Sequence, residues 1–324
     1  MQLRTINGAE IMTRERTPIR HHIRRWVPAG GYTLVNGEPG TGKTWIGLSM
    51  AVAISTGTEW MGCRTTQAPV IYLAGESKDD LVSRLQAYAE GTGIVLPDTL
   101  TIIEDSLSID RGRDLVEIEQ LVIRTGAKLI IVDPLVRCLR ETDENNNQEV
   151  RECMERVCGT LGKHGCDILL VHHTAKGTAN GIVSGVYGGR GAGDWGGGAT
   201  SVISLNRKEK EGGVLIEQEK LCNGIKAEAI VAVLHQDYRE GETDDYLHAA
   251  TYGTPTTKQE IVDRIDAERI KQVVDILTAE GPMSAKSIEA KTGYTGGTRK
   301  RILAAGREKN IISYDSKQNV YSAC

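Results

Sequence analysis

Residues 37–44 have the spacing of a phosphate-binding loop, G-x-x-x-x-G-K-T. A strand-like run at residues 32–35 precedes the loop and a helical run at residues 44–55 follows it, which is the context that such a loop requires. Its glycines would let backbone amides face phosphate groups, and the helix N-terminus would add its positive dipole end. A glycine-rich turn without nucleotide is the weaker alternative. We predict that the loop binds ATP through Gly37, Glu38, Pro39, Gly40, Thr41, Gly42, Lys43 and Thr44.

Polar and charged residues end three of the apolar runs that follow. Runs at residues 68–76, 100–105, 128–134 and 166–173 alternate with amphipathic stretches, which is typical of a mostly parallel sheet covered by helices on both faces. Ligands bind such α/β sheets at the carboxyl ends of the strands. We therefore expect Glu76, Asp133 and the adjacent His172 and His173 to lie near the loop.

These residue types suit ATP hydrolysis with Mg²⁺. Lys43 would bridge the β and γ phosphates, and the Thr44 hydroxyl would ligate Mg²⁺, which Asp133 would hold through a water. Glu76 would orient or deprotonate the attacking water. A histidine would donate a hydrogen bond when nucleotide is bound. The simpler alternatives are solvated carboxylates at the strand ends and a structural role for the histidines.

The composition is that of an ordinary soluble protein, with 324 residues, of which 40% are apolar and 25% charged. The sequence contains neither a run of roughly 20 apolar residues nor an apolar N-terminal signal, so we expect a cytoplasmic protein without a membrane partner. The seven cysteines are scattered and never in C-x-x-C spacing, which argues for reduced thiols and against a structural zinc site.

The C-terminal tail differs from the body in charge and in pattern. Residues 282–324 carry eight Lys or Arg against three Asp or Glu, whereas the preceding residues sum to −9. Three helical segments from residue 266 onward, followed by two short strands, predict a winged helix with a basic surface suited to a polyanion. A protein contact or a merely solvated helix face is the alternative. The candidates for DNA contact on the third helix are Arg299, Lys300, Arg301 and Arg307.

Several motifs, in order, resemble one known family. The series RRWVPAGGYTLVNGEPGTGKT, VIYLAGE, LIIVDPLVRCLRETDENNN and ILLVHHTAKG, followed by a glycine-rich loop and RGAG, resembles the RepA-like hexameric replicative helicases of plasmids and mobile elements, which belong to the RecA superfamily. The resemblance covers about residues 18–235. It implies a RecA-like ATPase that forms a homo-hexameric ring, binds ATP between subunits and moves single-stranded DNA through its centre.

The resemblance also assigns roles to particular residues. Lys43 and Thr44 match the phosphate-binding loop, and Glu76 matches the catalytic carboxylate. Asp133 matches the Walker B aspartate, and His173 matches the sensor at a strand end better than His172 does. A further arginine of the family pattern corresponds to Arg84.

One position departs from the family. Thr200 lies near the place where the family has an arginine finger that reaches the ATP of a neighbouring subunit. Arg190, Arg207 and Lys220 are the alternatives for this role, and the sequence does not choose among them. The departure concerns the dependence of hydrolysis on a ring of subunits, and so the helicase function, rather than ATP binding.

A glycine-rich segment follows the two histidines, and ten of residues 175–199 are glycine. By the resemblance, this segment would project towards the ring axis and become ordered on DNA, because glycine costs conformational entropy to fix. Lys176 and Arg190 would contact the DNA backbone, and Trp195 would stack on bases. An inert linker is the alternative.

We therefore predict an α/β protein with an N-terminal arm (1–17), a RecA-like ATPase domain (18–250), a linker (251–265) and a winged helix-turn-helix domain (266–324). The basic stretch RERTPIRHHIRRW would pack on a neighbouring subunit or form a flexible arm. The expected function is that of an ATP-hydrolysing, DNA-binding replicative helicase or translocase of a plasmid, phage or mobile element. The alternative is an ATP-controlled DNA-binding regulator or loader that does not unwind strands. A P-loop kinase fits less well, since the chain offers a glycine-rich loop and a basic tail in place of a lid and an acceptor pocket.

Overall fold

The computed structural model describes residues 5–16, 18–75, 77–173, 194–208, 213–241 and 245–324. The chain divides into two compact units, Met1–Pro255 and Thr256–Cys324. Within the described ranges, no helix is long and apolar enough to cross a membrane.

The first unit is built on a mostly parallel sheet with the strand order β10-β9-β8-β3-β7-β6-β4-β5. The strands from β3 to β8 run parallel to one another, and β9 and β10 are antiparallel additions at one edge. This sheet confirms the predicted α/β fold class, a mostly parallel sheet flanked by helices. The strands are β3 (Tyr32–Gly37), β4 (Val70–Ala74), β5 (Leu100–Ile103), β6 (Leu129–Asp133), β7 (Asp167–His173), β8 (Ser201–Lys208), β9 (Gly213–Leu221) and β10 (Ile230–Ala232).

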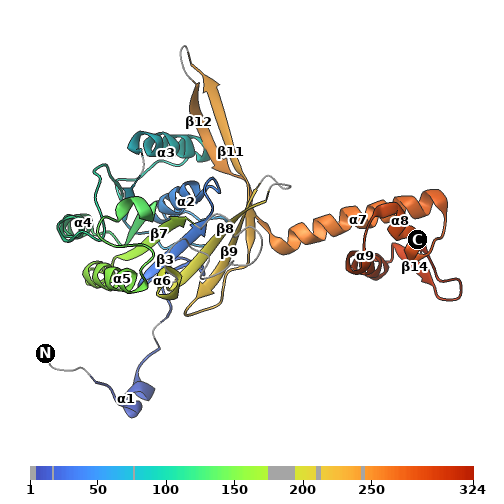
Figure 1. Cartoon of the computed structure of the whole chain (residues 1–324), viewed down its shortest axis with the longest axis horizontal. Coiled ribbons are helices and arrows are strands. Elements are labelled where there is room, and N and C mark those ends of the chain that lie inside the picture. The colour runs from blue at the N-terminus through green and yellow to red at the C-terminus, as the bar shows by residue number, and fades with distance from the viewer. Residues whose placement is uncertain (1–4, 17, 76, 174–193, 209–212, 242–244) are drawn as a thin grey trace. The chain divides into compact units, whose positions relative to one another are not determined.

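Helices cover both faces of this sheet (Figure 1). The helices α2 (Lys43–Thr56) and α3 (Lys78–Thr92) pack on one face. The opposite face is covered by α4 (Gly112–Thr125), α5 (Asn147–Gly162) and the short α6 (Asp194–Gly197), and a 3-10 turn, η1 (Leu135–Cys138), follows β6. Alternate strand residues enter the two cores, so that Val35 faces α2 while Leu34 faces α5. Burial of both faces explains why the strands are unbroken apolar runs.

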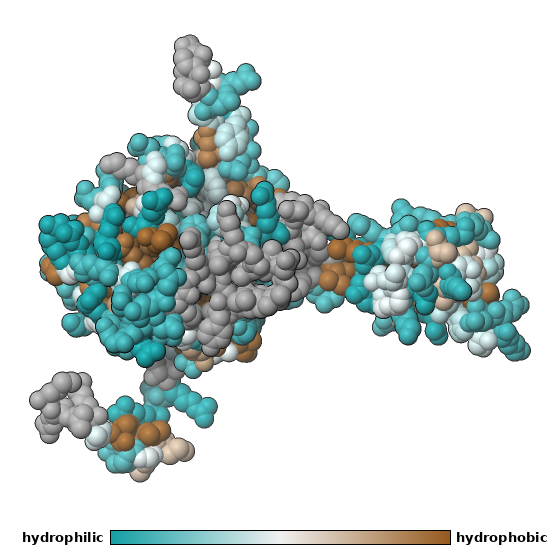
Figure 2. Space-filling view, viewed as in Figure 1, coloured by the Kyte–Doolittle hydropathy of each residue, from teal (hydrophilic) through white to brown (hydrophobic). Residues whose placement is uncertain are grey.

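The N-terminal segment contains a short helix and a hairpin. Helix α1 (Gly8–Thr13) begins with a capping box, in which Asn7 and Glu10 each accept a hydrogen bond from the other's backbone N–H. No residue of α1 is buried, and its apolar side chains Ile11 and Met12 are 56% and 85% exposed. Figure 2 shows this apolar surface on α1 in brown. The strands β1 (His21–Ile23) and β2 (Val27–Pro28) pair antiparallel, and Ile23 joins the core beside α2.

A second hairpin packs against α3. Its strands are β11 (Leu234–Glu240) and β12 (Asp245–Tyr252), which are antiparallel. The backbones of α3 and β12 approach so closely that a Cβ on Gly91 would lie 2.3 Å from the carbonyl oxygen of Ala250. Glycine at position 91 is therefore required for this contact.

The second unit consists of three helices and a hairpin, in the order that the sequence predicts. Its core contains Ile270, Val273, Leu277, Ile288, Ile302, Leu303 and Ile312. The elements are β13 (Thr256–Thr257), α7 (Lys258–Glu280), α8 (Ala285–Thr292), α9 (Gly296–Glu308), β14 (Ile312–Asp315) and β15 (Val320–Ala323).

Helix α7 begins earlier than the sequence analysis expected. The start was predicted at residue 266, after a linker at residues 251–265, but the helix starts at Lys258 and the preceding residues include the end of β12 and all of β13. The physical reason is a capping box between Thr257 and Glu260, which satisfies two backbone donors at the helix start. The signal T-x-x-E was therefore present in the sequence.

Candidate nucleotide-binding site

The turn between β3 and α2 has the curled backbone that a phosphate-binding loop needs. Gly40 and Gly42 adopt left-handed conformations with φ values of 79° and 83°, which side chains rarely tolerate. Gly37 is restricted by space instead, because a Cβ there would lie 2.7 Å from Thr41 Oγ1 and 3.0 Å from the Leu205 carbonyl oxygen. The backbone N–H and hydroxyl of Thr41 both donate to the Glu38 carbonyl, which closes the turn.

Lys43 lies inside this turn. Its Nζ donates to the carbonyl oxygens of Gly37 and Glu38, each at 2.8 Å, and the residue is only 5% exposed. The ammonium group is thus held at the base of the loop, at the start of α2. Phosphate oxygens at the loop would meet a positive charge that is already in place.

Asp133 ends β6 beside the loop and is 5% exposed. Its Oδ2 accepts a hydrogen bond of 2.5 Å from the hydroxyl of Tyr72, a fully buried residue of β4. Burial, and then the charge of Asp133, raise the pKa of Tyr72 well above its usual value, so the hydroxyl keeps its proton and acts as the donor. The tyrosine therefore orients the carboxylate. The sequence did not point to Tyr72, because a tyrosine within the apolar run VIYLAGE is expected to be an ordinary core residue of a buried strand.

A cavity of about 530 Å³ brings these elements together. The phosphate-binding loop and the start of α2 form one wall, and the ends of β6 and β7 form another. The lining residues are Pro39, Gly40, Thr41, Gly42, Lys43, Thr44, Trp45, Arg84, Asp133, Pro134, His173, Arg207, Gly213, Val214, Leu234, Gln236 and Tyr252.

Positive charge dominates the lining of this cavity. Lys43 comes from the loop, Arg84 from α3 and Arg207 from β8, and Asp133 is the one carboxylate among the described lining residues. A cavity with three cations suits a polyphosphate. The hydroxyl of Thr44 and the carboxylate of Asp133 are oxygen ligands of the kind that Mg²⁺ takes together with substrate phosphates and water. Across the described parts of the chain, no cluster of three or more His, Cys, Asp or Glu could hold a metal by itself.

The two histidines at the end of β7 occupy different environments. His173 lines the cavity, and its backbone pairs with Gly37 of the loop strand. His172 is 1% exposed and lies on the opposite face, with its ring centroid 6.0 Å from that of Trp195 and its Nε2 4.0 Å from Glu144 Oε2. Successive side chains of a strand point to opposite faces, so only one of the pair can face the cavity.

The structure separates the arginine-finger candidates. Arg207 lines the cavity of its own chain. Lys220 donates from Nζ to the carbonyls of Gly196 and Gly197, at 3.1 and 2.6 Å, and so satisfies the C-terminal end of α6. Thr200 donates from its hydroxyl and its N–H to the Tyr32 carbonyl, which fixes it to β3. Arg190 lies outside the described residues.

The prediction that Trp195 stacks on DNA bases is wrong. Trp195 is 1% exposed in α6, packs in the core over α5 and donates from Nε1 to the Glu144 carbonyl at 3.3 Å. A tryptophan in a glycine-rich segment suggested an exposed ring, but the ring fills the space beside His172. Glu76 and Lys176 lie outside the described residues.

The four cations predicted on the third helix of the tail all lie on α9, and three of them have partners within the second unit. Arg299 forms an ion pair with Glu289, and Arg301 bonds to Asp266 at 2.9 Å. Arg307 lies over the ring of Tyr314, 5.6 Å from its centroid. Lys300 is exposed, as are Arg301 and Arg307, whereas Arg299 is partly buried.

One of the comparisons with known proteins identifies a family for this chain. The family model described as the AAA domain matches residues 3–179, which include the loop, Asp133 and both histidines. No curated protein matches the chain. Among solved structures, the chain is similar to a KaiC-like protein, PH0186, from the hyperthermophilic archaeon Pyrococcus horikoshii OT3, at 17% identity and a TM-score of 0.47, over 71% of this chain and 99% of that one.

Proposed function

From the premise that the chain belongs to the AAA-domain family, a P-loop ATPase family, we propose that it is a DNA-dependent motor that couples ATP hydrolysis to movement on single-stranded DNA. It would act as a homo-hexameric ring, a replicative helicase or translocase of a mobile element. The observation that carries the ATPase half is the meeting of Lys43, Thr44, Asp133 and His173 around one cationic cavity.

The cavity assigns a task to each of these groups. Loop amides and Lys43 would bind the β and γ phosphates, and Thr44 and Asp133 would hold Mg²⁺, which supplies charge neutralisation when bound. Tyr72 keeps the Asp133 carboxylate in place through its hydrogen bond. His173 would donate to the γ-phosphate, and Arg84 and Arg207 would offset the remaining negative charge. Glu76 is proposed as the residue that activates water.

Two features support the DNA-binding and ring-forming half. The second unit places exposed Lys300, Arg301 and Arg307 on α9, which suits backbone phosphates if this unit acts as a winged helix. The exposed apolar residues Ile11 and Met12 of α1 would gain from burial against a neighbouring subunit. Lys176 and Arg190 are proposed to contact the strand within the ring.

A second candidate function is an ATP-controlled DNA-binding regulator or loader without unwinding activity. The observation that favours it concerns Thr200, which lies near the position of the finger arginine in the RepA-like helicases and bonds to Tyr32. Arg207, in addition, lines the subunit's own cavity. A subunit that supplies its own arginine would hydrolyse ATP without a neighbour's help.

The decisive experiment measures ATPase rate and oligomeric mass together, with and without single-stranded DNA. The motor predicts a hexamer whose ATPase is stimulated by DNA, and Lys43→Ala should abolish hydrolysis in either state. Slow hydrolysis that no nucleic acid stimulates would contradict the motor. Strand displacement by the purified protein would contradict the regulator.

A further inference from the structure

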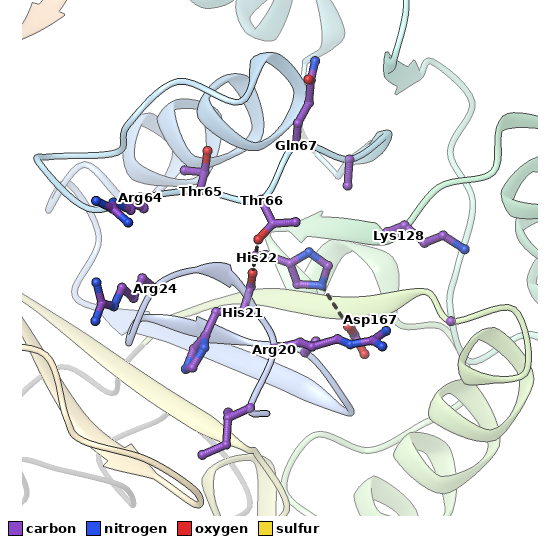
Figure 3. A pocket seen from close by; sticks show the side chains of 14 residues that line it. Arg20, His21, His22, Arg24, Arg64, Thr65, Thr66, Gln67, Lys128 and Asp167 are labelled. Carbon is purple, nitrogen blue, oxygen red and sulfur yellow. Dashed lines mark hydrogen bonds and ion pairs between the residues drawn. The ribbon is translucent and has the colours of Figure 1, made fainter. Parts of the chain in front are cut away.

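A second cavity, of about 640 Å³, lies at the opposite end of the parallel sheet from the nucleotide cavity. Asp167, which lines it, begins β7, whereas His173, which lines the nucleotide cavity, ends the same strand. Seven residues of strand separate the two cavities by about 20 Å. Figure 3 shows Arg24 and Arg64 on one side of this second cavity and Arg20 and Lys128 on the other. We call it the basic cavity, after these four residues.

The charge of the basic cavity is positive and largely uncompensated. Arg20, Arg24, Arg64 and Lys128 are all exposed at the lining, and Asp167 is its one carboxylate among the described lining residues. Both oxygens of Asp167 are already engaged, because Oδ2 accepts from His22 Nε2 at 2.8 Å and Oδ1 from the Gly30 N–H at 2.9 Å. In the described part of the chain, no ion pair forms on Arg20, Arg24 or Arg64.

The backbone holds two of these arginines directly opposite each other. Ile23 and Thr65 form an antiparallel bridge, and the Arg24 N–H donates to the Arg64 carbonyl at 2.9 Å. The Thr66 hydroxyl also donates to the His21 carbonyl at 2.8 Å, which fixes the same wall. Like charges placed opposite each other across paired strands are destabilising. The charges of this pair therefore do not stabilise the fold, and an anion bound between the two guanidinium groups would relieve the repulsion.

The size of the basic region distinguishes a polymer from a small anion. Exposed arginines continue beyond the cavity, at Arg14 and Arg16 along the N-terminal segment and at Arg25 beside Arg24, and Glu15 is the one acidic residue in residues 14–25. A single phosphate would leave most of these cations unused. We propose that the basic cavity binds the sugar–phosphate backbone of a nucleic acid strand, with Arg24 and Arg64 sharing one phosphate and Arg20 and Lys128 contacting the next. This inference rests on the proposed function only in taking nucleic acid as the ligand.

His21 provides a local probe of the site. Its side chain lines the basic cavity, and burial, followed by the charge of Arg24, lowers the pKa of its imidazole. A phosphate bound beside it would favour the protonated ring and raise that pKa. Occupancy of the cavity can therefore be followed by the histidine ring resonances, separately from binding elsewhere on the chain.

The test compares the wild type with the double variant Arg24→Gln and Arg64→Gln in the binding of a labelled oligothymidylate over a range of salt concentrations. Because Arg24 and Arg64 share one phosphate, the double variant loses one phosphate contact, which lowers the salt slope by about 0.7 for a single strand. At about 0.1 M salt, this corresponds to binding that is roughly fivefold weaker. The matched control is Arg113→Gln with Arg124→Gln, which removes the same charge from exposed positions on α4.

Four results would overturn the inference. If the double variant binds the oligonucleotide with the affinity and salt slope of the wild type, the basic cavity does not contact the strand. The proposed motor would still be supported in that case if DNA continued to stimulate the ATPase. If the double variant and the α4 control lose the same amount of affinity, the effect comes from the net charge of the protein and not from contacts in the basic cavity. If inorganic pyrophosphate shifts the His21 resonances but the oligonucleotide does not, the cavity is a small-anion site. Absence of any nucleic acid binding by the wild type would remove this inference together with the DNA half of the proposed function.

Discussion

Replacing Tyr72 by phenylalanine tests whether the tyrosine positions the carboxylate of Asp133, which is proposed to hold Mg²⁺. The change removes one hydroxyl that is fully buried and bonded to Asp133 Oδ2 at 2.5 Å, and it leaves the ring in place between α2 and the sheet. Asp133 is 5% exposed, so water cannot easily replace the lost donor. The variant therefore leaves a buried carboxylate oxygen without this hydrogen bond.

Two effects of measurable size should follow. A hydrogen bond to a charged group contributes about 1.5–3 kcal/mol, so we expect the free energy of unfolding of the first unit to fall by about 2 kcal/mol. With a urea dependence of about 2 kcal/mol per molar, the unfolding midpoint would fall by about 1 M. Residues that orient a metal ligand typically change metal affinity or activity by about 10–100-fold, so Mg²⁺-dependent ATP binding should weaken by at least about tenfold.

The matched control is Tyr88→Phe. Tyr88 lies on α3 beside the same core, burial raises its pKa to about 12, and its hydroxyl bonds to no other residue within the described ranges. Urea titration and a fluorescent ATP analogue, each with and without Mg²⁺, measure both effects. If Tyr72→Phe and Tyr88→Phe have the same midpoint and the same Mg²⁺ dependence, the tyrosine does not position Asp133.

Three further predictions concern other parts of the first unit. Gly47→Ala should weaken Mg²⁺-dependent ATP binding, as Tyr72→Phe does, because the added Cβ would lie 3.2 Å from the Tyr72 hydroxyl and displace it from Asp133. Isothermal titration of ATP with and without Mg²⁺ measures this loss of affinity. Trp195→Ala should lower the free energy of unfolding by about 3–5 kcal/mol, as other buried tryptophans do, and lost DNA affinity at unchanged stability would contradict its buried position. Burial raises the pKa values of the Cys138 and Cys166 thiols to about 12, so the unfolded chain loses these protons first and stability falls as pH rises above about 8.5. In reducing buffer, the free energies of unfolding from urea titrations at pH about 7.5 and about 9.5 should differ by about 1.4 kcal/mol for each thiol, and a flat profile would be inconsistent with their burial.

The sequence was most informative where a chemical requirement and a periodic pattern coincide. The loop at residues 37–44 needs glycines at fixed positions, and the left-handed Gly40 and Gly42 show the reason. Unbroken apolar runs predicted a parallel sheet because both faces of the strands are buried. Asp133 could be placed because it ends such a run, and the strand end fixes its position in the fold.

The parts that could not be predicted depend on contacts between distant segments. Tyr72 reaches Asp133 across 61 positions of sequence, and nothing local distinguishes it from a tyrosine that only packs. Arg84 and Arg207 enter the nucleotide cavity from α3 and β8, elements whose proximity is a property of the whole sheet. Trp195 was misread for the same reason, since its partners Glu144 and His172 belong to other segments.

The end of β7 joins the nucleotide cavity to the segment that follows it. His173 faces the cavity, and the adjacent His172 packs against Trp195 of α6, just after residues 174–193. Neighbouring residues of one strand cannot shift independently, because the backbone is fixed by hydrogen bonds to β3 and β6. A movement of His173 towards a γ-phosphate would therefore change the contact between His172 and Trp195. Since α6 is capped by Lys220 from β9, that change would also reach the antiparallel strands that follow β8 in the sheet.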